Sequence, residues 1–380
     1  MPFFAKAKKS IVFFFKNTDR ILLLLCVLTS VYGFILVYSA AGGSFRGYIL
    51  QLAAYIVGLL AAIGISQIDY EAICAFWPVW AGISVVLVIL TLTPLGLGVG
   101  GADDQAWLAI RLGSFQMTLQ PAELMKVAFI ITFSKHLSMV REEINRPKNL
   151  LLLLLHGAVP IGLVTLQGDD GTMLVFFLML VTMLFIAGVK PLYFLIAGIA
   201  GGCVLPFIWD LVIKEKMDRI LALIYVEDYL QGAGWQQYQS LISLGSGGLW
   251  GKGYMNGGSF FARNNDFILT VAGEEFGFIG ALLVLVLLAL IIWEIWRCAA
   301  TARDRLGMFL CVGTMAMIAF QTIINIGMVL RLLPVVGITL PFFSTGGTSV
   351  GTLYLAIGLV FSVHFSSRAR AHNTIFTKPL

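Results

Sequence analysis

Charged residues are scarce in this 380-residue sequence: Asp, Glu, Lys and Arg make up 12% of it, against roughly a quarter of a soluble domain. Hydrophobic residues make up 59%. Apolar stretches long enough to cross a membrane recur along the whole chain, which no single soluble core requires. The composition therefore excludes an ordinary soluble domain and indicates an integral membrane protein.

Other absences exclude further classes. A ten-residue alternating pattern, typical of membrane β-barrels, is missing, and so is the Walker spacing of a nucleotide-binding loop. No metal-ligand spacing links the five cysteines, and none lies in a predicted outer loop, so we expect them to be small, inert apolar residues. The net charge of +5 suits the anionic face of a membrane, and we expect no nucleic-acid partner. The cysteines are Cys26, Cys74, Cys203, Cys298 and Cys311.

The apolar stretches predict about ten transmembrane helices in a single all-α polytopic domain over residues 1–380. Each approaches the ~20 helical residues that cross the hydrocarbon core, where backbone groups must pair within the segment. The first follows Arg20 and has no small-residue cleavage site, so we expect a retained helix and not a signal peptide. The predicted spans are 21–38, 48–65, 75–94, 120–137, 150–166, 172–188, 191–213, 267–296, 308–333 and 340–365.

The placement of Lys and Arg predicts the orientation. With both termini in the cytoplasm, the basic N-terminus (1–20) and the tail (366–380) lie inside, together with most other basic residues. The short outer loops then keep only Arg46, Arg111 and Arg331. The inverted arrangement would reverse this bias.

Two outer segments are longer than simple connections. Residues 95–119 contain Trp107 and Arg111, and residues 214–266 form a large extracytoplasmic loop between the seventh and eighth spans. Loops of such length are usually functional or disordered. The aromatic residues of the second loop and its apolar run Leu221–Tyr225 argue against disorder.

The segment LQPAELMK (119–126) carries charge into the fourth span. Glu123 and Lys126 are three residues apart and share a helix face, which allows a direct ion pair. Such a pair either neutralises itself at the start of the helix or takes part in function, because ionisable groups inside spans are commonly functional. The sequence favours neither interpretation.

The segment QGDDGT (167–172) lies at the start of the sixth span. Asp169, Asp170 and Thr172 fit a helix N-cap, where acidic side chains complement the positive end of the helix. We expect capping to be their main role.

The segment RNNDFILTVAGEEFGFIG (263–280) is the most informative. Asp266 is the last polar residue before a long apolar run, which places it at the outer membrane surface as a helix cap or as a working acid. Glu274 lies roughly 12 Å deeper, at 1.5 Å per residue, and needs a cation or a polar cavity. Glu274 and Glu275 point about 100° apart on a helix, so we expect that one partner does not serve both.

Two further segments complete the set. Residues 232–258 contain GAGWQQYQS and SGGLWGKG, whose glycines allow a close approach to a ligand or to another segment. Residues 325–347 contain Arg331, Pro334 and Pro341, and the two prolines flank what we expect to be a tight outer turn.

Together these segments resemble the SEDS family (shape, elongation, division and sporulation), whose RodA- and FtsW-like members are peptidoglycan glycosyltransferases. The resemblance covers nearly the whole chain. LQPAELMK, NNDFIL…GEEFG, GWQQYQS…SGGLWGKG and LPFFSTGGTS occur in the family's order, and IDYE, LPVVGI and GGTS look more RodA-like than FtsW-like. The sequence departs from the common pattern at Ala106, Gly168, Asp170 and Asn265.

The resemblance implies polymerisation of lipid II on the outer face, where a sugar hydroxyl displaces undecaprenyl diphosphate with inversion. It implies Asp266 as the general base and cations near the diphosphate, with Lys126 as the main candidate. The remaining polar residues proposed to bind substrate are Gln120, Glu123, Arg111, Arg219, Arg263, Arg331, Gln239, Ser240 and Ser344. Asp169, Thr172 and Glu274 are the accompanying polar residues at the helix starts.

The implied partners are lipid II, a class B penicillin-binding protein and the elongation machinery. The residues identify no certain cofactor and no metal ligand, although acids and diphosphate leave room for a shared divalent cation, Mg²⁺ or Mn²⁺. Three alternatives stay open: a lipid II flippase, a non-catalytic scaffold for cell-wall partners, and a SEDS polymerase of division or sporulation.

Overall fold

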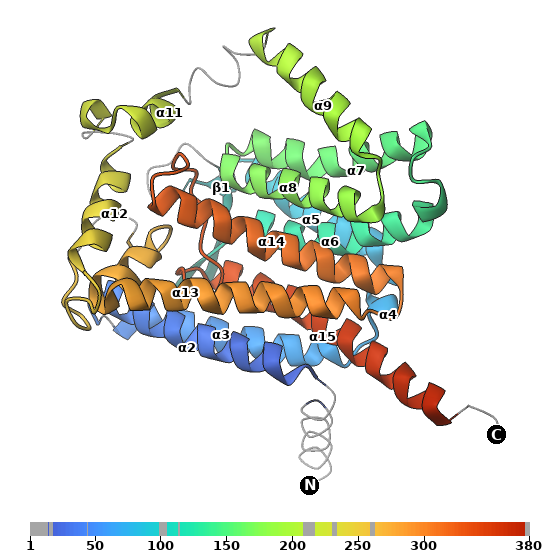
Figure 1. Ribbon diagram of the computed structural model, residues 1–380, viewed down its shortest axis with the longest axis horizontal. Coiled ribbons are helices and arrows are strands. Elements are labelled where there is room, and N and C mark those ends of the chain that lie inside the picture. Colours follow the sequence, from blue (N-terminus) through green and yellow to red (C-terminus); the bar gives the residue numbers. More distant parts are fainter. Residues whose placement is uncertain are drawn as a thin grey trace.

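The computed structural model is a bundle of long helices with a small antiparallel sheet at its side (Figure 1). Its described residues are 14, 18–43, 45–98, 105–112, 115–207, 217–229, 234–258 and 263–376.

All ten predicted spans correspond to helices. The first five predicted spans are α2 (Arg20–Ala40), α3 (Phe45–Ser66), α4 (Tyr70–Ala75) with α5 (Trp77–Thr91), α6 (Pro121–Val140) and α7 (Pro147–Leu166). The last five are α8 (Asp170–Ala187), α9 (Pro191–Val204), α13 (Ile268–Ala300), α14 (Arg305–Val329) and α15 (Gly347–Phe376). The polytopic all-α class is thereby confirmed.

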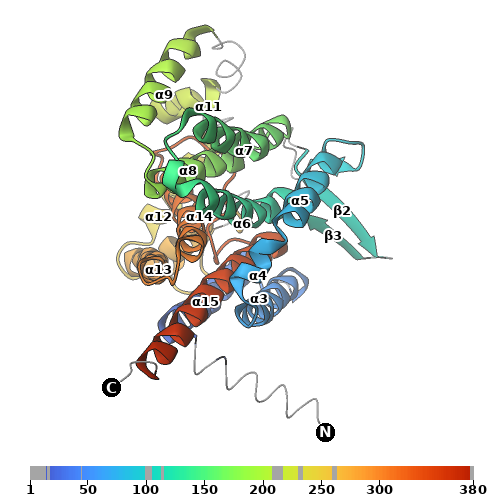
Figure 2. The same cartoon turned by 90° about the vertical axis from the view of Figure 1, so that its right-hand side faces the viewer.

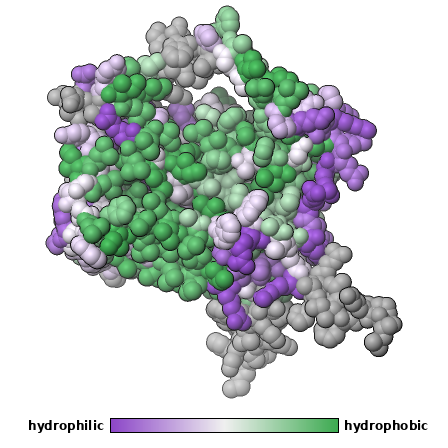
Figure 3. Space-filling view, in the orientation of Figure 1, coloured by the Kyte–Doolittle hydropathy of each residue, from purple (hydrophilic) through white to green (hydrophobic). Residues whose placement is uncertain are grey.

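Among the described residues, seven helices are both long and apolar enough to cross a bilayer. Two more predicted spans, α5 and α9, are apolar but shorter. The helix α6 has 20 residues, but Glu123, Lys126 and Lys135 lower its hydropathy. Figure 3 shows a broad apolar face over the middle of the bundle, with hydrophilic residues along its right-hand and lower right edges. An apolar belt between polar ends is what a lipid bilayer requires.

The long helices pack both against the next helix in the chain and against helices distant in sequence. The closest neighbours are α15 with α3, α13 with α14, α5 with α6, and α14 with α8. The helix α9 stands apart in both views, and no side chain of Pro191–Val204 is buried (Figures 1 and 2).

The two long outer segments contain structure of their own. Residues 95–119 hold strands β1 (Gly96–Leu97), β2 (Trp107–Leu112) and β3 (Phe115–Leu119), which pair antiparallel in that order. Figure 2 shows the β2–β3 hairpin beside α5. Of residues 214–266, the described part contains α11 (Met217–Ile224), a 3₁₀ turn (Val226–Tyr229) and α12 (Trp235–Ser246).

The tenth span begins later than hydropathy predicts. The sequence suggests a start at residue 340, but α15 begins at Gly347, and residues 338–346 instead form a loop against the turn before α13. Hydropathy misplaces this boundary because Leu340, Phe342 and Phe343 are buried inside the protein, so their apolar character reflects packing and not contact with lipid.

Candidate active site

Asp266 lies half-buried in the turn that precedes α13. The side-chain amide of Asn325, in α14, donates to the main-chain carbonyls of Asp266 at 2.6 Å and Ile338 at 2.7 Å. A β-carbon on Gly337 would lie 3.9 Å from the Asp266 Oδ2 atom, so the backbone at Gly337 passes directly beside the carboxylate. Asn325 therefore joins the Asp266 turn to the loop between α14 and α15.

Ser344 and Thr345 hold the same turn from the other side. Ser344 Oγ donates to the carbonyl of Asn265 at 2.6 Å and accepts from the amide of Leu340 at 2.8 Å. The amide of Thr345 donates to the carbonyl of Asn264 at 3.1 Å. Ser344, proposed from its motif to bind substrate, is buried and positions the residues before Asp266.

Two side chains of α3 donate hydrogen bonds to this loop. Tyr55 donates its hydroxyl proton to the carbonyl of Phe342 at 2.6 Å, and Gln51 Nε2 donates to the carbonyl of Ser344 at 3.1 Å. Phe342 has a φ of 66°, in the left-handed region that side-chain-bearing residues rarely adopt. Strained backbone of this kind persists where the surroundings fix it, often at functional sites.

Asp169 caps α8, as its sequence predicts. Its Oδ1 atom accepts from the amide of Thr172 at 2.9 Å, and its Oδ2 atom accepts from Gln120 Nε2 at 3.1 Å. A β-carbon on the neighbouring Gly171 would lie 2.4 Å from the carbonyl oxygen of Val336. Only glycine allows this contact, which packs the start of α8 against the loop beside Asp266.

The two carboxylates interact electrostatically. Burial, and then the negative charge of Asp169, raises the pKa of Asp266 to about 6. Burial also raises the pKa of Asp169, while its hydrogen bonds with Thr172 and the charge of Lys126 act in the opposite direction. Lys126, Asp169 and Asp266 thus belong to one electrostatic network.

The ion pair predicted on α6 is present. Lys126 Nζ lies 2.7 Å from Glu123 Oε1, and the lysine side chain has no exposed surface. Thr352 in α15 donates its hydroxyl proton to Glu123 Oε2 at 3.3 Å. Lys126 is therefore buried and paired, and it acts on Asp169 through its charge.

Arg263, expected to bind substrate, is instead held by two glutamates. Its Nη2 atom lies 3.0 Å from Glu274 Oε2 and 3.3 Å from Glu275 Oε1, and all three side chains are buried. The expectation that one partner does not serve both acids was wrong, because their flexible side chains converge on a guanidinium that has several donors. Glu274 has the cation its depth requires, and a second one in Lys252 at 2.8 Å.

The glutamates precede a break in α13 that the sequence did not indicate. Gly277 has a φ of 69° and a ψ of −164° inside the helix. The backbone groups that the break leaves without a partner in the helix pair with the SGGLWGKG segment. Lys252 N donates to Glu274 O at 2.9 Å, and Phe278 N donates to Gly248 O at 2.9 Å. The glycines of both segments therefore allow a loop to enter the helix.

Two more proposed binding residues join protein segments to one another. Arg331 donates to the carbonyl of Leu223 at 2.7 and 3.1 Å and so caps the end of α11. Ser240 donates to the carbonyl of Val329 at 2.7 Å. Gln237, which the sequence analysis missed, donates to the carbonyls of Met328 and Leu333. Together these side chains fix α11 and α12 to the end of α14.

The remaining proposed binding residues are Arg219, Gln239 and Arg111. Arg219 is exposed and makes a long contact of 3.4 Å to the carbonyl of Val335, next to the backbone that borders Asp266. Gln239 is half-buried on α12. Arg111 lies in β2 opposite Gln116, and its side chain is outside the described atoms.

A cavity of about 950 Å³ opens at the opposite end of the bundle. Its lining includes Glu71, Lys135, Arg141, Asp304 and Arg305. Asp266 and its neighbours contribute nothing to this lining, so cavity size does not identify the candidate active site, whereas the convergence of buried polar groups does.

A bundle of apolar helices with a carboxylate of raised pKa at one end defines a polytopic membrane protein with a polar site at that end. Residues 19–369 match the family model FTSW_RODA_SPOVE, described as cell cycle protein. The chain therefore belongs to this family, in agreement with the resemblance of its motifs.

Individual relatives come from several branches of the family. Stage V sporulation protein E of Bacillus subtilis is 33% identical, covering 93% of this chain and 98% of its own. A probable peptidoglycan glycosyltransferase FtsW of Trichlorobacter lovleyi is 32% identical, with coverages of 91% and 92%. Peptidoglycan glycosyltransferase MrdB of Escherichia coli K12 is 29% identical, with coverages of 92% and 94%.

Solved structures share the fold. A structure described as "Structural coordination of polymerization and crosslinking by a peptidoglycan synthase complex" has a TM-score of 0.79 and 26% identity, covering 92% of this chain and 98% of its own. The rod shape determining protein RodA of Thermus thermophilus has a TM-score of 0.68 and 27% identity, with coverages of 91% and 96%.

Proposed function

We propose that this membrane enzyme is a peptidoglycan glycosyltransferase that polymerises lipid II at the outer face of the cytoplasmic membrane. Relatives from two genera carry the name peptidoglycan glycosyltransferase. One observation carries the mechanism: Asp266 is half-buried, held by Asn325 and by the loop beside Gly337, and its pKa is raised to about 6. A general base works best when its pKa lies near the working pH.

In the proposed reaction, an acceptor sugar hydroxyl attacks the anomeric carbon of a second lipid-linked disaccharide. The new glycosidic carbon–oxygen bond forms as the bond to undecaprenyl diphosphate breaks, and the hydroxyl proton passes to Asp266. One carboxylate suffices for a single inverting displacement, whereas a double displacement needs a second, nucleophilic one.

The leaving diphosphate needs positive charge where negative charge accumulates. Lys126, Arg263 and Arg331 are engaged with protein groups. We assign this role to the exposed Arg219, which lies against Val335, and to Arg111 on the β2–β3 hairpin. Lys126 is a positioning residue, because its charge acts on Asp169.

A divalent cation would find a suitable carboxylate in Asp266, since Mg²⁺ and Mn²⁺ favour oxygen ligands. Both oxygens of Asp169 already accept hydrogen bonds, which leaves Asp266 as the open ligand. Such an ion would add positive charge beside the diphosphate.

We assign the cellular role to side-wall elongation, together with a class B penicillin-binding protein as the partner. The RodA-like segments IDYE, LPVVGI and GGTS support elongation, and the likeness to a peptidoglycan synthase complex supports a partner. One relative is named for sporulation, so complementation of strains lacking either an elongation or a division polymerase tests this assignment.

The decisive experiment is polymerisation of purified lipid II by the full-length protein in detergent or liposomes, with and without Mg²⁺ or Mn²⁺. Asp266→Asn should retain the fold and lose activity by at least about a hundredfold, as expected when a general base is removed. Asp218→Asn, an exposed acid in α11, is the matched control and should polymerise like wild type.

Polymerisation by Asp266→Asn at the wild-type rate would refute the mechanism. Transport of lipid II into sealed vesicles that is unaffected by Asp266→Asn, without polymer formation by either protein, would identify a flippase. Absence of both polymerisation and transport from the wild-type protein would favour a scaffold.

A further inference from the structure

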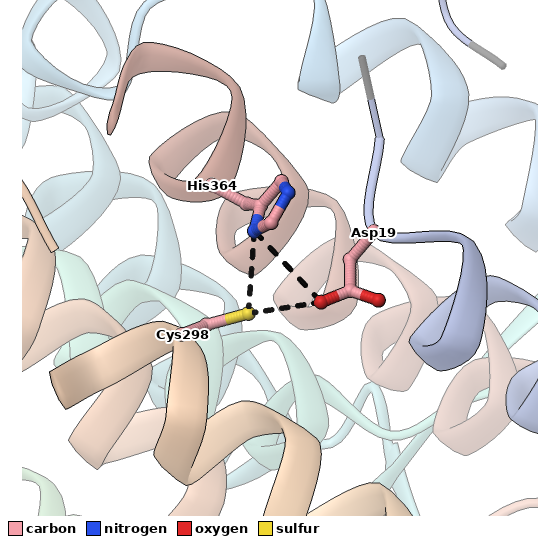
Figure 4. Close-up of side chains that lie close together, drawn as sticks. All are labelled: Asp19, Cys298 and His364. Carbon is pink, nitrogen blue, oxygen red and sulfur yellow. Dashed lines mark hydrogen bonds and ion pairs between the residues drawn. The ribbon is translucent and has the colours of Figure 1, made fainter. Parts of the chain in front are cut away.

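Three metal-ligand side chains converge far from Asp266, at the end of the bundle where α13 finishes. Asp19 precedes α2, Cys298 lies in the last turns of α13, and His364 lies in α15 (Figure 4). The Cys298 Sγ atom lies 3.8 Å from Asp19 Oδ2 and 3.8 Å from His364 Nδ1, and the last two atoms are also 3.8 Å apart. The three atoms form an equilateral triangle.

The dimensions of this triangle match a metal centre. The middle of an equilateral triangle with 3.8 Å sides lies about 2.2 Å from each corner. Zinc binds sulfur at about 2.3 Å, imidazole nitrogen at about 2.0–2.1 Å and carboxylate oxygen at about 2.0–2.2 Å. We infer that Asp19, Cys298 and His364 form a transition-metal site, with Zn²⁺ as the ion that best fits a sulfur, nitrogen and oxygen ligand set.

Direct contacts among the three side chains explain the arrangement less well. The Cys298 thiol reaches Asp19 Oδ2 and His364 Nδ1 only by long sulfur hydrogen bonds of 3.8 Å. The separation of 3.8 Å between His364 Nδ1 and Asp19 Oδ2 is longer than a hydrogen bond between nitrogen and oxygen. A Cys–His–Asp catalytic relay is also excluded, because it needs the thiol and the acid on different ring nitrogens. Here both atoms face Nδ1, and Nε2 has no hydrogen-bond partner among the described residues.

The surroundings prepare the ligands for an ion. The other oxygen of Asp19, Oδ1, accepts from the amides of Ile21 at 3.0 Å and Leu22 at 3.1 Å, which holds the carboxylate in place as outer-shell contacts do. Cys298 is buried, while Asp19 and His364 keep 11% and 20% of their side-chain surface exposed. The site is therefore partly accessible, and a water molecule can complete four-fold coordination.

Charge balance favours a divalent ion. A thiolate and a carboxylate together neutralise Zn²⁺, with a neutral imidazole as the third ligand. The nearby Arg297 is already paired with Glu294 at 2.8 Å. A bound ion would join α2, α13 and α15 at the end of the bundle opposite Asp266, which gives the site a structural role separate from the proposed chemistry.

Metal content and stability of the tag-free full-length protein test this inference. After chelation and removal of the chelator, added Zn²⁺ should be retained at about one ion per chain and should raise the apparent melting temperature. Co²⁺ in place of Zn²⁺ should give the charge-transfer absorption of a cobalt–thiolate bond. Both signals should be lost in Cys298→Ala. In Asp19→Asn, which keeps a capping side chain, the affinity for the ion should fall at least about tenfold.

Cys74→Ala is the matched control, because Cys74 is a buried thiol in α4 with no described Asp–His pair around it, and it should bind like wild type. Elution as a monodisperse peak shows that each variant is folded. Zinc binding that is absent from the wild-type protein, or unchanged in both Cys298→Ala and His364→Gln, overturns the proposal. Since neither readout is polymerisation, this outcome leaves the proposed function untouched.

Discussion

At Asp266, burial and the charge of Asp169 act in the same direction, and together they raise its pKa to about 6. A base must be deprotonated to accept a proton, so the polymerisation rate should fall as the pH decreases through about 6. Initial rates of lipid II polymerisation between about pH 5 and about pH 8 would show this acidic limb. A profile that stays flat down to about pH 5 would contradict the assignment of Asp266.

The contribution of Asp169 to the raised pKa of Asp266 can be tested separately. Asp169→Asn removes a negative charge but keeps a side chain that caps α8. The pKa of Asp266 should then decrease, and the acidic limb should move to lower pH by less than the whole shift, because burial is the larger cause. Asp218→Asn serves again as the control, and an unmoved limb in Asp169→Asn would show that the two acids are not coupled.

The same raised pKa predicts a stability effect. The folded-state pKa of Asp266 lies above the value of about 3.9 in an unfolded chain, so the ionised carboxylate destabilises the folded protein as the pH rises through about 6. Asp266→Asn should therefore melt at or above the wild-type temperature at about pH 7.5. It should keep part of this advantage near pH 5 and lose it only below the unfolded-state pKa of about 3.9. Tryptophan fluorescence during heating measures it, and a lower melting temperature at about pH 7.5 would contradict the sign.

Among the elements, α13 depends on its internal break at Gly277. A β-carbon there would lie 2.4 Å from both Gly251 N and Leu249 O, and the φ of 69° is itself costly for any other residue. Gly277→Ala should destabilise the protein by several kcal/mol, in the upper part of the range for single substitutions. The expected result is a clear fall in apparent melting temperature together with loss of polymerisation.

The control for this substitution is Gly82→Ala. Gly82 lies in α5 with nothing within 4 Å of an added β-carbon, and alanine favours a helix more than glycine by about 1 kcal/mol. Its melting temperature should stay equal or rise. Equal stability of the two variants would show that the loop does not need to enter the helix.

Hydropathy alone predicted the helices of the ten spans, because lipid-facing apolar runs of about twenty residues leave little choice of structure. Periodicity also predicted the Glu123–Lys126 pair, and capping rules predicted the role of Asp169. The sequence did not predict the β2–β3 hairpin, the loop 338–346 or the Arg263 pairing with Glu274 and Glu275. In each of these, partners distant in sequence decide the structure, and a pattern within one segment carries no information about them.

Across the whole molecule, the candidate site is formed by turns and helix ends from separate parts of the chain. Asp266, its neighbour Asp169 and the loop at Gly337 meet because α8, α13, α14 and α15 pack together, with α3 and α6 behind them. The zinc ligands follow the same principle, since Asp19 and Cys298 are 279 residues apart. Spacing within the sequence therefore could not reveal either cluster.

The orientation of the whole molecule is the prediction on which the proposed chemistry depends, because lipid-linked sugars are polymerised outside the cytoplasm. Trp250 and Met139 lie at opposite ends of the bundle and are 76% and 71% exposed. In a Cys203→Ser background, which leaves four buried cysteines, a membrane-impermeant maleimide should label Trp250→Cys in spheroplasts and Met139→Cys only after permeabilisation. The basic residues near Met139 favour this orientation, and the reverse labelling would place Asp266 in the cytoplasm, out of reach of its proposed substrate.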